Sequence, residues 1–202
     1  MRRAGARLVG VDEAGRGPLA GPVVVAAVAL PKEPSAALSE ARDSKIVSPQ
    51  ARRRLFAVIR SEALAVSVAW AHPKAIDRDN ILAATLAAMG RAARRAAAKS
   101  GAGPLLVLVD GPSSIREFEL PQRTVVDGDA KSLCIAAASI VAKVVRDRWM
   151  ERLDRRHPGY GFARHKGYGT RAHVDALDRL GPCGAHRMTY APVARRARKA
   201  AR

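Results

Sequence analysis

Several apolar runs along the chain predict strands that are buried on one or both faces. Residues 105–109 form an uninterrupted apolar run, which is typical of a strand covered on both faces. Residues 64–70 alternate in a way that favours a strand with one buried face. The other predicted strands are residues 8–11, 23–30 and 124–126, the last of them short.

Longer stretches with apolar residues on one face predict helices. Ser48 followed by Pro49 is a favourable helix start, because the serine side chain can accept from a free backbone amide and proline fits the first turn. We therefore expect a helix over residues 49–63. Similar patterns predict a short helix near residues 77–80 and longer helices over 81–98, 132–156 and 170–180, the last capped by Thr170.

The order of these elements predicts an α/β fold, with a mixed sheet flanked by helices and a small helical C-terminal region. Because no internal repeat or linker divides the chain, we expect one domain over residues 1–192, with residues 157–192 as its helical part. Residues 193–202 carry five positive charges and little apolar bulk, so they predict a basic disordered tail.

Charge identifies the class of partner. The chain has 36 Lys and Arg against 18 Asp and Glu, and its net charge is +18. A protein this basic is expected to bind polyanions through salt-dependent phosphate contacts. Hydrophobic residues make up 48% of the chain but aromatic residues only 4%, so small side chains are expected to fill the core.

The cysteines and the N-terminus bear on location. Cys134 and Cys183 lie far apart without a C-x-x-C pair, which favours free buried thiols in a reducing compartment and disfavours a zinc site. The charged N-terminus is not followed by the apolar segment of a signal peptide, and no apolar run reaches about 18 residues. We therefore expect a cytoplasmic monomer without membrane contact.

The most informative stretch begins where the first predicted strand ends. Asp12 and Glu13 stand side by side there, and a loop containing Gly15, Arg16 and Gly17 follows. Successive strand side chains point to opposite faces, so both acids meet one ligand only if the strand bulges or ends at them. The glycines favour such an irregularity and let backbone amides approach a ligand closely. A tight hairpin turn with a solvated acid pair explains this stretch equally well.

Two further acids lie at the boundaries of apolar elements. Asp110 directly follows the buried run 105–109, and Asp129 precedes the helix predicted over 132–156. Helix capping is the structural alternative for Asp129. Together with the first pair, these acids could hold two divalent cations, Mn²⁺ or Mg²⁺, for phosphodiester hydrolysis. Carboxylates without such ions would repel a polyanionic substrate.

The motifs around these residues resemble the type 2 ribonucleases H, and within them the bacterial ribonuclease HII family. The resemblance extends from about Leu8 to Pro192, and the motifs are highly specific when they occur together in this order. They are VDEAGRGPLAGPV at 11–23, DSK at 43–45, VDG at 109–111, GD at 128–129, AASIVAKVVRD at 137–147, YGF at 160–162 and HKGY at 165–168.

The resemblance implies a ribonuclease-H-like fold and an endonuclease that cleaves RNA in RNA–DNA hybrids. It also implies cutting 5′ of ribonucleotides embedded in duplex DNA, as in ribonucleotide excision repair, with 5′-phosphate and 3′-hydroxyl products. The acids that match the family's catalytic, metal-binding residues are Asp12, Glu13, Asp110 and Asp129.

The substrate-binding residues are implied in the same way. The backbone of the loop Gly15, Arg16 and Gly17 matches the element that senses the 2′-hydroxyl at the RNA-to-DNA junction, the group that separates RNA from DNA. Tyr168 matches the tyrosine that stacks on the adjacent deoxyribose. Arg16 and three lysines are expected near phosphates, with surface salt bridges as the alternative; the lysines are Lys45, Lys143 and Lys166.

Two positions depart from the family pattern. Gly169 stands where proline is common, and Ala130 replaces a frequent serine.

Three other functions compete with the one that the resemblance implies. A non-catalytic basic binding module would not explain four acids at element ends. A phosphotransferase would need a G-x-x-x-x-G-K-[ST] loop, which is absent. A DNA-specific nuclease of the same fold is disfavoured by the 2′-hydroxyl-sensing loop and Tyr168.

Overall fold

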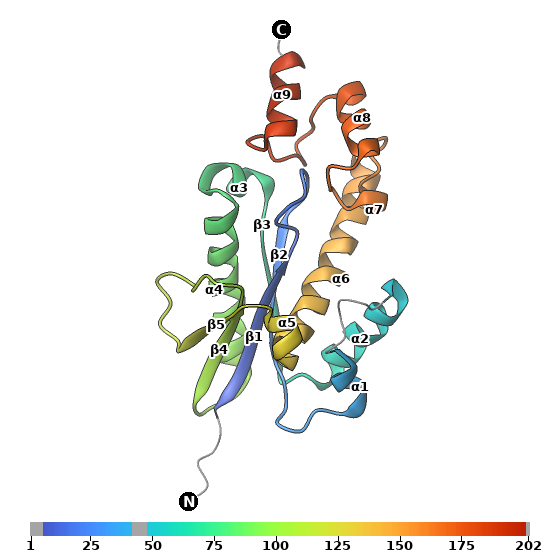
Figure 1. Cartoon of the computed structure of the whole chain (residues 1–202). Helices are drawn as coiled ribbons and strands as arrows, with labels where there is room; N and C mark the ends of the chain where they lie inside the picture. Colours follow the sequence, from blue (N-terminus) through green and yellow to red (C-terminus); the bar gives the residue numbers. More distant parts are fainter. Residues whose placement is uncertain (1–5, 42–47, 201–202) are drawn as a thin grey trace, which may run out of the picture.

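A computed structural model describes residues 6–41 and 48–200, with only the backbone of residues 199 and 200. The described chain forms a five-stranded sheet in the order β3-β2-β1-β4-β5 (Figure 1). β1 pairs antiparallel with β2 and parallel with β4, so the predicted mixed sheet is confirmed. The strands are β1 (Arg7–Ala14), β2 (Val23–Ala29), β3 (Ala65–Ala71), β4 (Leu105–Asp110) and β5 (Gln122–Val125).

Helices cover both faces of the sheet (Figure 1). α4 (Ile81–Lys99) packs against β1, β2 and β3 on one face, and α6 (Leu133–Arg156) packs against β1 and β2 on the other, with α2 (Pro49–Glu62) beside it. The remaining helices are α1 (Ala36–Ser39), α3 (Pro73–Asp79), α5 (Gly128–Lys131), α7 (Phe162–His165), α8 (Arg171–Leu180) and α9 (Ala191–Ala200).

Two of the three side chains considered as helix caps do cap a helix in the structure. The Ser48 side chain accepts from the Ala51 amide, and the Thr170 side chain accepts from the His173 amide. Asp129 does not cap the long helix, because Ser132 occupies the N-cap position of α6 and Asp129 lies inside the short helix α5. The capping explanation of Asp129 is therefore wrong.

β1 and α6 approach each other at a glycine. A Cβ atom added to Gly10 would lie 2.2 Å from the carbonyl carbon of Cys134 and 2.3 Å from the nitrogen of Ile135. The backbone of the strand is therefore in direct contact with the first turn of the helix. Because side chains alternate along β1, Asp12 points to the same face as Gly10 and meets α6 further along the helix.

The C-terminal segment differs from its prediction. Residues 193–200 are not a disordered tail but belong to the helix α9. Val193 is fully buried in an apolar cluster with Leu19 and Phe162, and Arg196 forms an ion pair with Asp178 of α8 at 2.8 Å. Burial of the Val193 side chain in this cluster stabilises the helix, and local composition does not reveal that contact.

Two other observations concern the rest of the described chain. None of its helices is long and apolar enough to cross a membrane. Cys134 is buried, Cys183 is half-buried, and both are free thiols, so the predicted burial is confirmed for Cys134. The motif residues 43–45, including Lys45, lie outside the described residues.

The contact at Gly10 predicts a large cost for the smallest possible substitution. Gly10→Ala should lower the free energy of unfolding by about 2–3 kcal/mol, because backbone atoms on both sides cannot give way. Gly184→Ala is the matched control, since an added Cβ there meets nothing within 4 Å. Urea unfolding of both variants checks this, and similar stabilities for the two would contradict the close packing of β1 and α6.

Candidate active site

Three predicted acids meet at one edge of the sheet, where two parallel strands end. The last pair between β1 and β4 is Val11 with Val109, so Asp12 and Glu13 on β1 and Asp110 on β4 follow directly. The expected bulge is absent, because β1 stays in register with β2 through Ala14. The acids approach one another because Asp110, the last residue of β4, follows the same final strand pair as Asp12 of β1.

Asp12 is the most perturbed of these acids. Asp12 is only 6% exposed. Its carboxylate accepts a hydrogen bond from the Glu13 amide at 2.6 Å and forms another with Ser139 of α6. Burial, followed by the charges of Glu13 and Asp110, raises the pKa of Asp12 to about 8. Without a compensating cation, this carboxyl therefore holds a proton near neutral pH.

Glu13 belongs to the same electrostatic group. Burial and the charge of Asp110 raise its pKa, while Arg16, 3.5 Å away, opposes the rise. Since Asp110 acts on both Asp12 and Glu13, the three carboxylates form a coupled cluster. They do not lie on separate sides of the molecule, which would have excluded a shared ion.

The fourth acid is connected to this cluster through the backbone. Asp110 Oδ1 accepts from the amide of Gly128 at 2.7 Å, and Asp129 is the next residue of α5. A Cβ atom on Gly128 would lie 2.9 Å from that oxygen and 2.6 Å from the Cδ1 of Ile135, so a larger residue there would displace the carboxyl of Asp110 or the Ile135 side chain. The Asp129 side chain accepts from the Ala130 amide at 3.0 Å.

The carboxylates are coupled but not arranged as a finished coordination shell. Within the described ranges, no three His, Cys, Asp or Glu side chains are already placed to hold a metal ion. Side-chain rotation would therefore have to accompany ion binding. The donor chemistry is nevertheless that of hard cations, since the four acids offer only oxygen ligands.

A cleft of about 280 Å³ joins the acidic edge to the glycine loop. Its walls come from β1, α2 and α6, and Tyr168 also lines it. The residues that line it are Glu13, Ala14, Gly15, Arg52, Ser139, Ile140, Lys143, Arg146 and Tyr168. Arg52 and Ser139 were not predicted as site residues, although Ser139 lies one helical turn before the predicted Lys143.

Tyr168 stands beside the glycine loop. A Cβ atom added to Gly17 would lie 3.8 Å from the ring of Tyr168, which is 48% exposed. The backbone holds the two segments together, because Leu19 donates its amide to the Gly167 carbonyl at 2.8 Å. The loop and the tyrosine can therefore contact the same ligand.

The predicted lysines differ in their surroundings. Lys143 lines the cleft, and its ammonium lies 2.5 Å from Asp147 on the next turn of α6. Lys166 pairs with Glu151 at 3.1 Å and is not part of the cleft lining. The salt-bridge alternative therefore describes both lysines in the free protein.

Two buried arginines lie beneath the glycine loop, and sequence reasoning missed both. Arg146 is 1% exposed and donates to the carbonyls of Pro22 and Ala20 at 3.1 and 3.3 Å. Arg187 is fully buried and also donates to loop carbonyls. Periodicity gives no signal for such residues, because arginine is normally exposed; only the position of Arg146 within a quoted motif could have suggested it.

Known proteins resemble this chain over nearly its whole length. The sequence model of the family described as Ribonuclease HII matches residues 9–193. A ribonuclease HII of Geotalea daltonii is 54% identical over 188 residues, which are 93% of this chain and 84% of the relative. A ribonuclease HII of Maricaulis maris is 52% identical over 187 residues, 93% of this chain and 83% of the relative.

Solved structures share the fold. The ribonuclease H2 of Pyrococcus horikoshii has a TM-score of 0.74 at 24% identity, over 96% of this chain and 98% of that one. Bst-RNase HIII in complex with Mn²⁺ has a TM-score of 0.75 at 19% identity, over 98% of this chain and 70% of that one. The sequence matches and the shared fold lead to one conclusion: this chain belongs to the ribonuclease HII family.

Proposed function

We propose that this protein hydrolyses the RNA strand of RNA–DNA hybrids and cuts 5′ of ribonucleotides embedded in duplex DNA. Its family membership makes it a ribonuclease H; the specificity for embedded ribonucleotides is our proposal. One observation carries it: Glu13, which interacts electrostatically with Asp110 and acts on Asp12, lines a cleft whose wall also includes Gly15 of the glycine loop and Tyr168. Cleavage chemistry and ribose recognition would then occupy one site.

The acids fit a pair of divalent cations, Mg²⁺ or Mn²⁺. The raised pKa of Asp12 reflects burial beside like charges, and a cation in place of the proton would remove that repulsion. The Mn²⁺ complex of Bst-RNase HIII supports the same class of ion. The residues that would hold the ions are Asp12, Glu13, Asp110 and Asp129. When bound, such ions activate water and stabilise the leaving 3′-oxygen.

The chain's own groups would select and orient the substrate. Backbone atoms of Gly15, Arg16 and Gly17 would test for the 2′-hydroxyl, and the Tyr168 ring would stack on the adjacent sugar. Ser139 would keep Asp12 in position through their hydrogen bond. Since all of these proposed contacts are with sugar or metal ligands and none is with a base edge, cleavage should be nearly independent of sequence.

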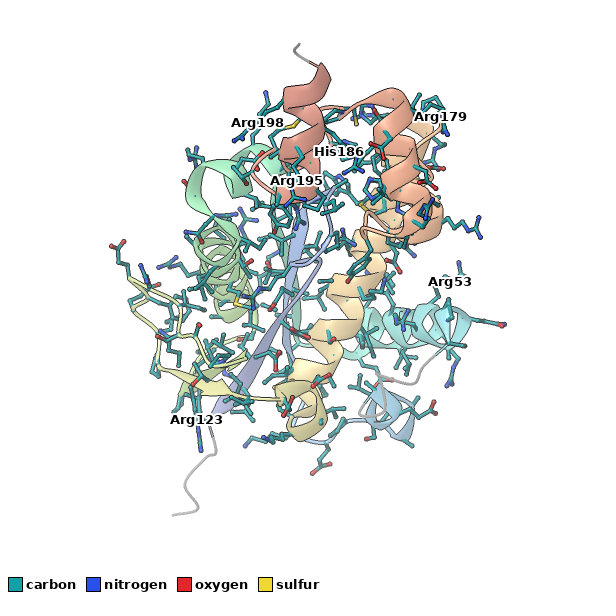
Figure 2. The ribbon with its side chains drawn as sticks, turned by 45° about the horizontal axis from the view of Figure 1, so that its top comes forward. Arg53, Arg123, Arg179, His186, Arg195 and Arg198 are labelled. Atoms are coloured by element: carbon teal, nitrogen blue, oxygen red, sulfur yellow. The ribbon has the colours of Figure 1, made fainter. Side chains whose placement is uncertain are left out.

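Positive charge around the cleft would bind the duplex backbone. Lys143 lies in the cleft, and Arg16 is exposed beside it, so both would contact phosphates close to the cut. Lys45 and Lys166 are also proposed to contact phosphates, and the Lys166 ammonium would leave Glu151 for a phosphate oxygen when substrate binds. Arginines project from α2, β5, α8 and α9, as labelled in Figure 2: Arg53, Arg123, Arg179, Arg195 and Arg198.

Biological role follows from this substrate. An enzyme that cuts beside a single ribonucleotide would start ribonucleotide excision repair, leaving a 3′-hydroxyl for further synthesis. A cytoplasmic location and a monomeric state remain predictions from the sequence, and the free thiols support a reducing compartment.

A labelled DNA duplex with one ribonucleotide tests the proposal directly. With Mg²⁺ or Mn²⁺ we expect a single cut 5′ of the ribonucleotide, and with chelator no cut. Asp110→Asn should retain duplex affinity while losing at least about a thousandfold in rate, because a required ligand oxygen is lost. An all-DNA duplex of the same sequence is the control. Full activity of Asp110→Asn, or cutting of the all-DNA duplex, would refute the assignment.

Tyr168→Ala separates substrate contact from packing. The ring is 48% exposed, so its removal should change the melting temperature little, by about 2 °C or less. Cleavage at a single ribonucleotide should fall about tenfold or more, as expected for loss of one stacking contact. Calorimetry and single-turnover kinetics on the same preparation check this. A fall in melting temperature that accounts for the lost rate would point to a packing role.

Asp12 predicts an unusual dependence of stability on pH. The pKa of Asp12 is about 8 in the folded protein against an ordinary 3.8 for an aspartate in the unfolded chain, so its stabilising contribution is complete below about pH 4. That contribution is lost as pH rises through 8. Without divalent ions, Asp12→Asn should therefore melt about 3–6 °C above the original protein at pH 8.5.

The same comparison at pH 5 is the internal control. At pH 5 the carboxyl of Asp12 keeps its proton in the folded state while the unfolded state has already lost it, so the advantage of Asp12→Asn should shrink to about a third of its size at pH 8.5. A saturating divalent ion at pH 8.5 should also stabilise the original protein but not the variant. An advantage of equal size at pH 5 and pH 8.5 would disprove the electrostatic explanation.

A further inference from the structure

Arg187 is a buried cation that contacts mainly the carbonyl oxygens of the glycine loop. Its side chain is fully buried, and one terminal nitrogen donates to the Gly15 carbonyl at 2.6 Å and to the Gly21 carbonyl at 3.0 Å. The other donates to the Arg16 carbonyl at 2.7 Å, and Nε donates to Gly21 at 3.1 Å. Burying a charge costs several kcal/mol unless polar partners compensate it; here the loop backbone supplies them.

Tyr190 completes this arrangement. Its hydroxyl donates to the Arg16 carbonyl at 2.9 Å and accepts from Arg187 at 3.0 Å. The Arg16 carbonyl thus receives two hydrogen bonds from residues more than 170 positions later in the chain. Two adjacent peptide groups of the loop, Gly15–Arg16 and Arg16–Gly17, are therefore fixed by one C-terminal pair.

The backbone around Arg187 is itself fixed against the loop. Arg187 donates its amide to the Leu19 carbonyl at 2.9 Å, and Gly21 donates its amide to the Ala185 carbonyl at 2.8 Å. An isolated bridge pairs Ala20 with His186, which is labelled in Figure 2. The guanidinium therefore approaches the loop from a rigid neighbour rather than from a mobile tail.

Fixing these carbonyls also fixes the amides that follow them. The described peptide bonds are trans, so an N–H points away from the C=O of the same peptide group. With the carbonyls of Gly15 and Arg16 turned toward Arg187, the amides of Arg16 and Gly17 point the other way. Both residues are exposed. A charged donor on a carbonyl also polarises its peptide group and strengthens the amide as a donor.

We infer that Arg187, with the Tyr190 hydroxyl, is a positioning residue that orients and polarises the Arg16 and Gly17 amides for ribose 2′-hydroxyl recognition. This inference rests on the proposed function, because it deepens the role given there to the glycine loop. It predicts that changing Arg187 or Tyr190 affects the preference for ribonucleotides and not general affinity for DNA.

Tyr190→Phe and Tyr160→Phe form a matched pair for the test. Each variant removes a tyrosine hydroxyl of the C-terminal part that donates to a backbone carbonyl. The Tyr190 hydroxyl donates to the Arg16 carbonyl, and the Tyr160 hydroxyl donates to the Gly181 carbonyl at 2.7 Å. Only Tyr190 reaches the glycine loop. We expect Tyr190→Phe to reduce kcat/KM on the single-ribonucleotide duplex about fivefold to tenfold, and Tyr160→Phe to leave it unchanged.

Arg187→Lys tests the fork geometry of the guanidinium. A lysine ammonium keeps the charge but cannot reach several carbonyls in a fixed arrangement. We expect at least a tenfold loss of kcat/KM on the ribonucleotide duplex, with a circular dichroism spectrum like that of the original protein. Affinity for the all-DNA duplex should stay within about twofold in each of these variants, because phosphate contacts are retained.

Binding without cleavage keeps this test separate from that of the proposed function. The ratio of affinities for the ribonucleotide and all-DNA duplexes, measured in chelator, should fall for Tyr190→Phe and Arg187→Lys but not for Tyr160→Phe. If the original protein cuts and prefers the ribonucleotide duplex while Tyr190→Phe matches it, only this inference is overturned. If the original protein shows no preference for the ribonucleotide duplex, both this inference and the proposed function are overturned. The positioning role is also overturned if the loss of kcat/KM in these variants is accompanied by an equal loss of affinity for the all-DNA duplex, or is explained by a lower melting temperature.

Discussion

Repulsion among carboxylates at one edge of the sheet is the constraint on which the rest of this structure depends. Asp12, Glu13 and Asp110 are brought together because β1 and β4 run parallel and the acids directly follow their last pair, Val11 with Val109. Burial then raises the pKa of Asp12 to about 8. Holding these carboxylates together costs stability, and this cost is the physical basis of the cation site proposed above.

The packing of β1 against α6 makes that cluster possible. Gly10 lets the strand touch the start of the helix, and two residues later Asp12 meets Ser139. A larger residue at position 10 would push α6 outward and expose Asp12 to water, which would relax its pKa. Core packing and site electrostatics are therefore consequences of the same close approach, and they cannot be altered independently.

A second constraint connects the two ends of the chain. The glycine loop has few side chains of its own with which to hold a shape, and it is held from beneath by Arg146 of α6 and Arg187 of the C-terminal part. A side chain at Gly15 would collide with Arg146, 1.9 Å from the position of its Cβ. The C-terminal helices thus support the loop next to the cleft, which explains why they pack on Leu19 and Ala20.

The sequence by itself determined the strands and the longer helices of the fold and suggested most residues of the proposed site. Strands, helices and the caps Ser48 and Thr170 were predictable because hydrophobic period and capping chemistry are local properties. The acids were predictable from their positions at element ends, and the motifs indicated the family. Only the tertiary structure revealed that the acids converge without a bulge and that residues 193–200 form a helix around Val193. It also revealed Arg146 and Arg187 as buried supports. The two arginines bind partners more than 100 residues away in sequence, and no local pattern records such contacts.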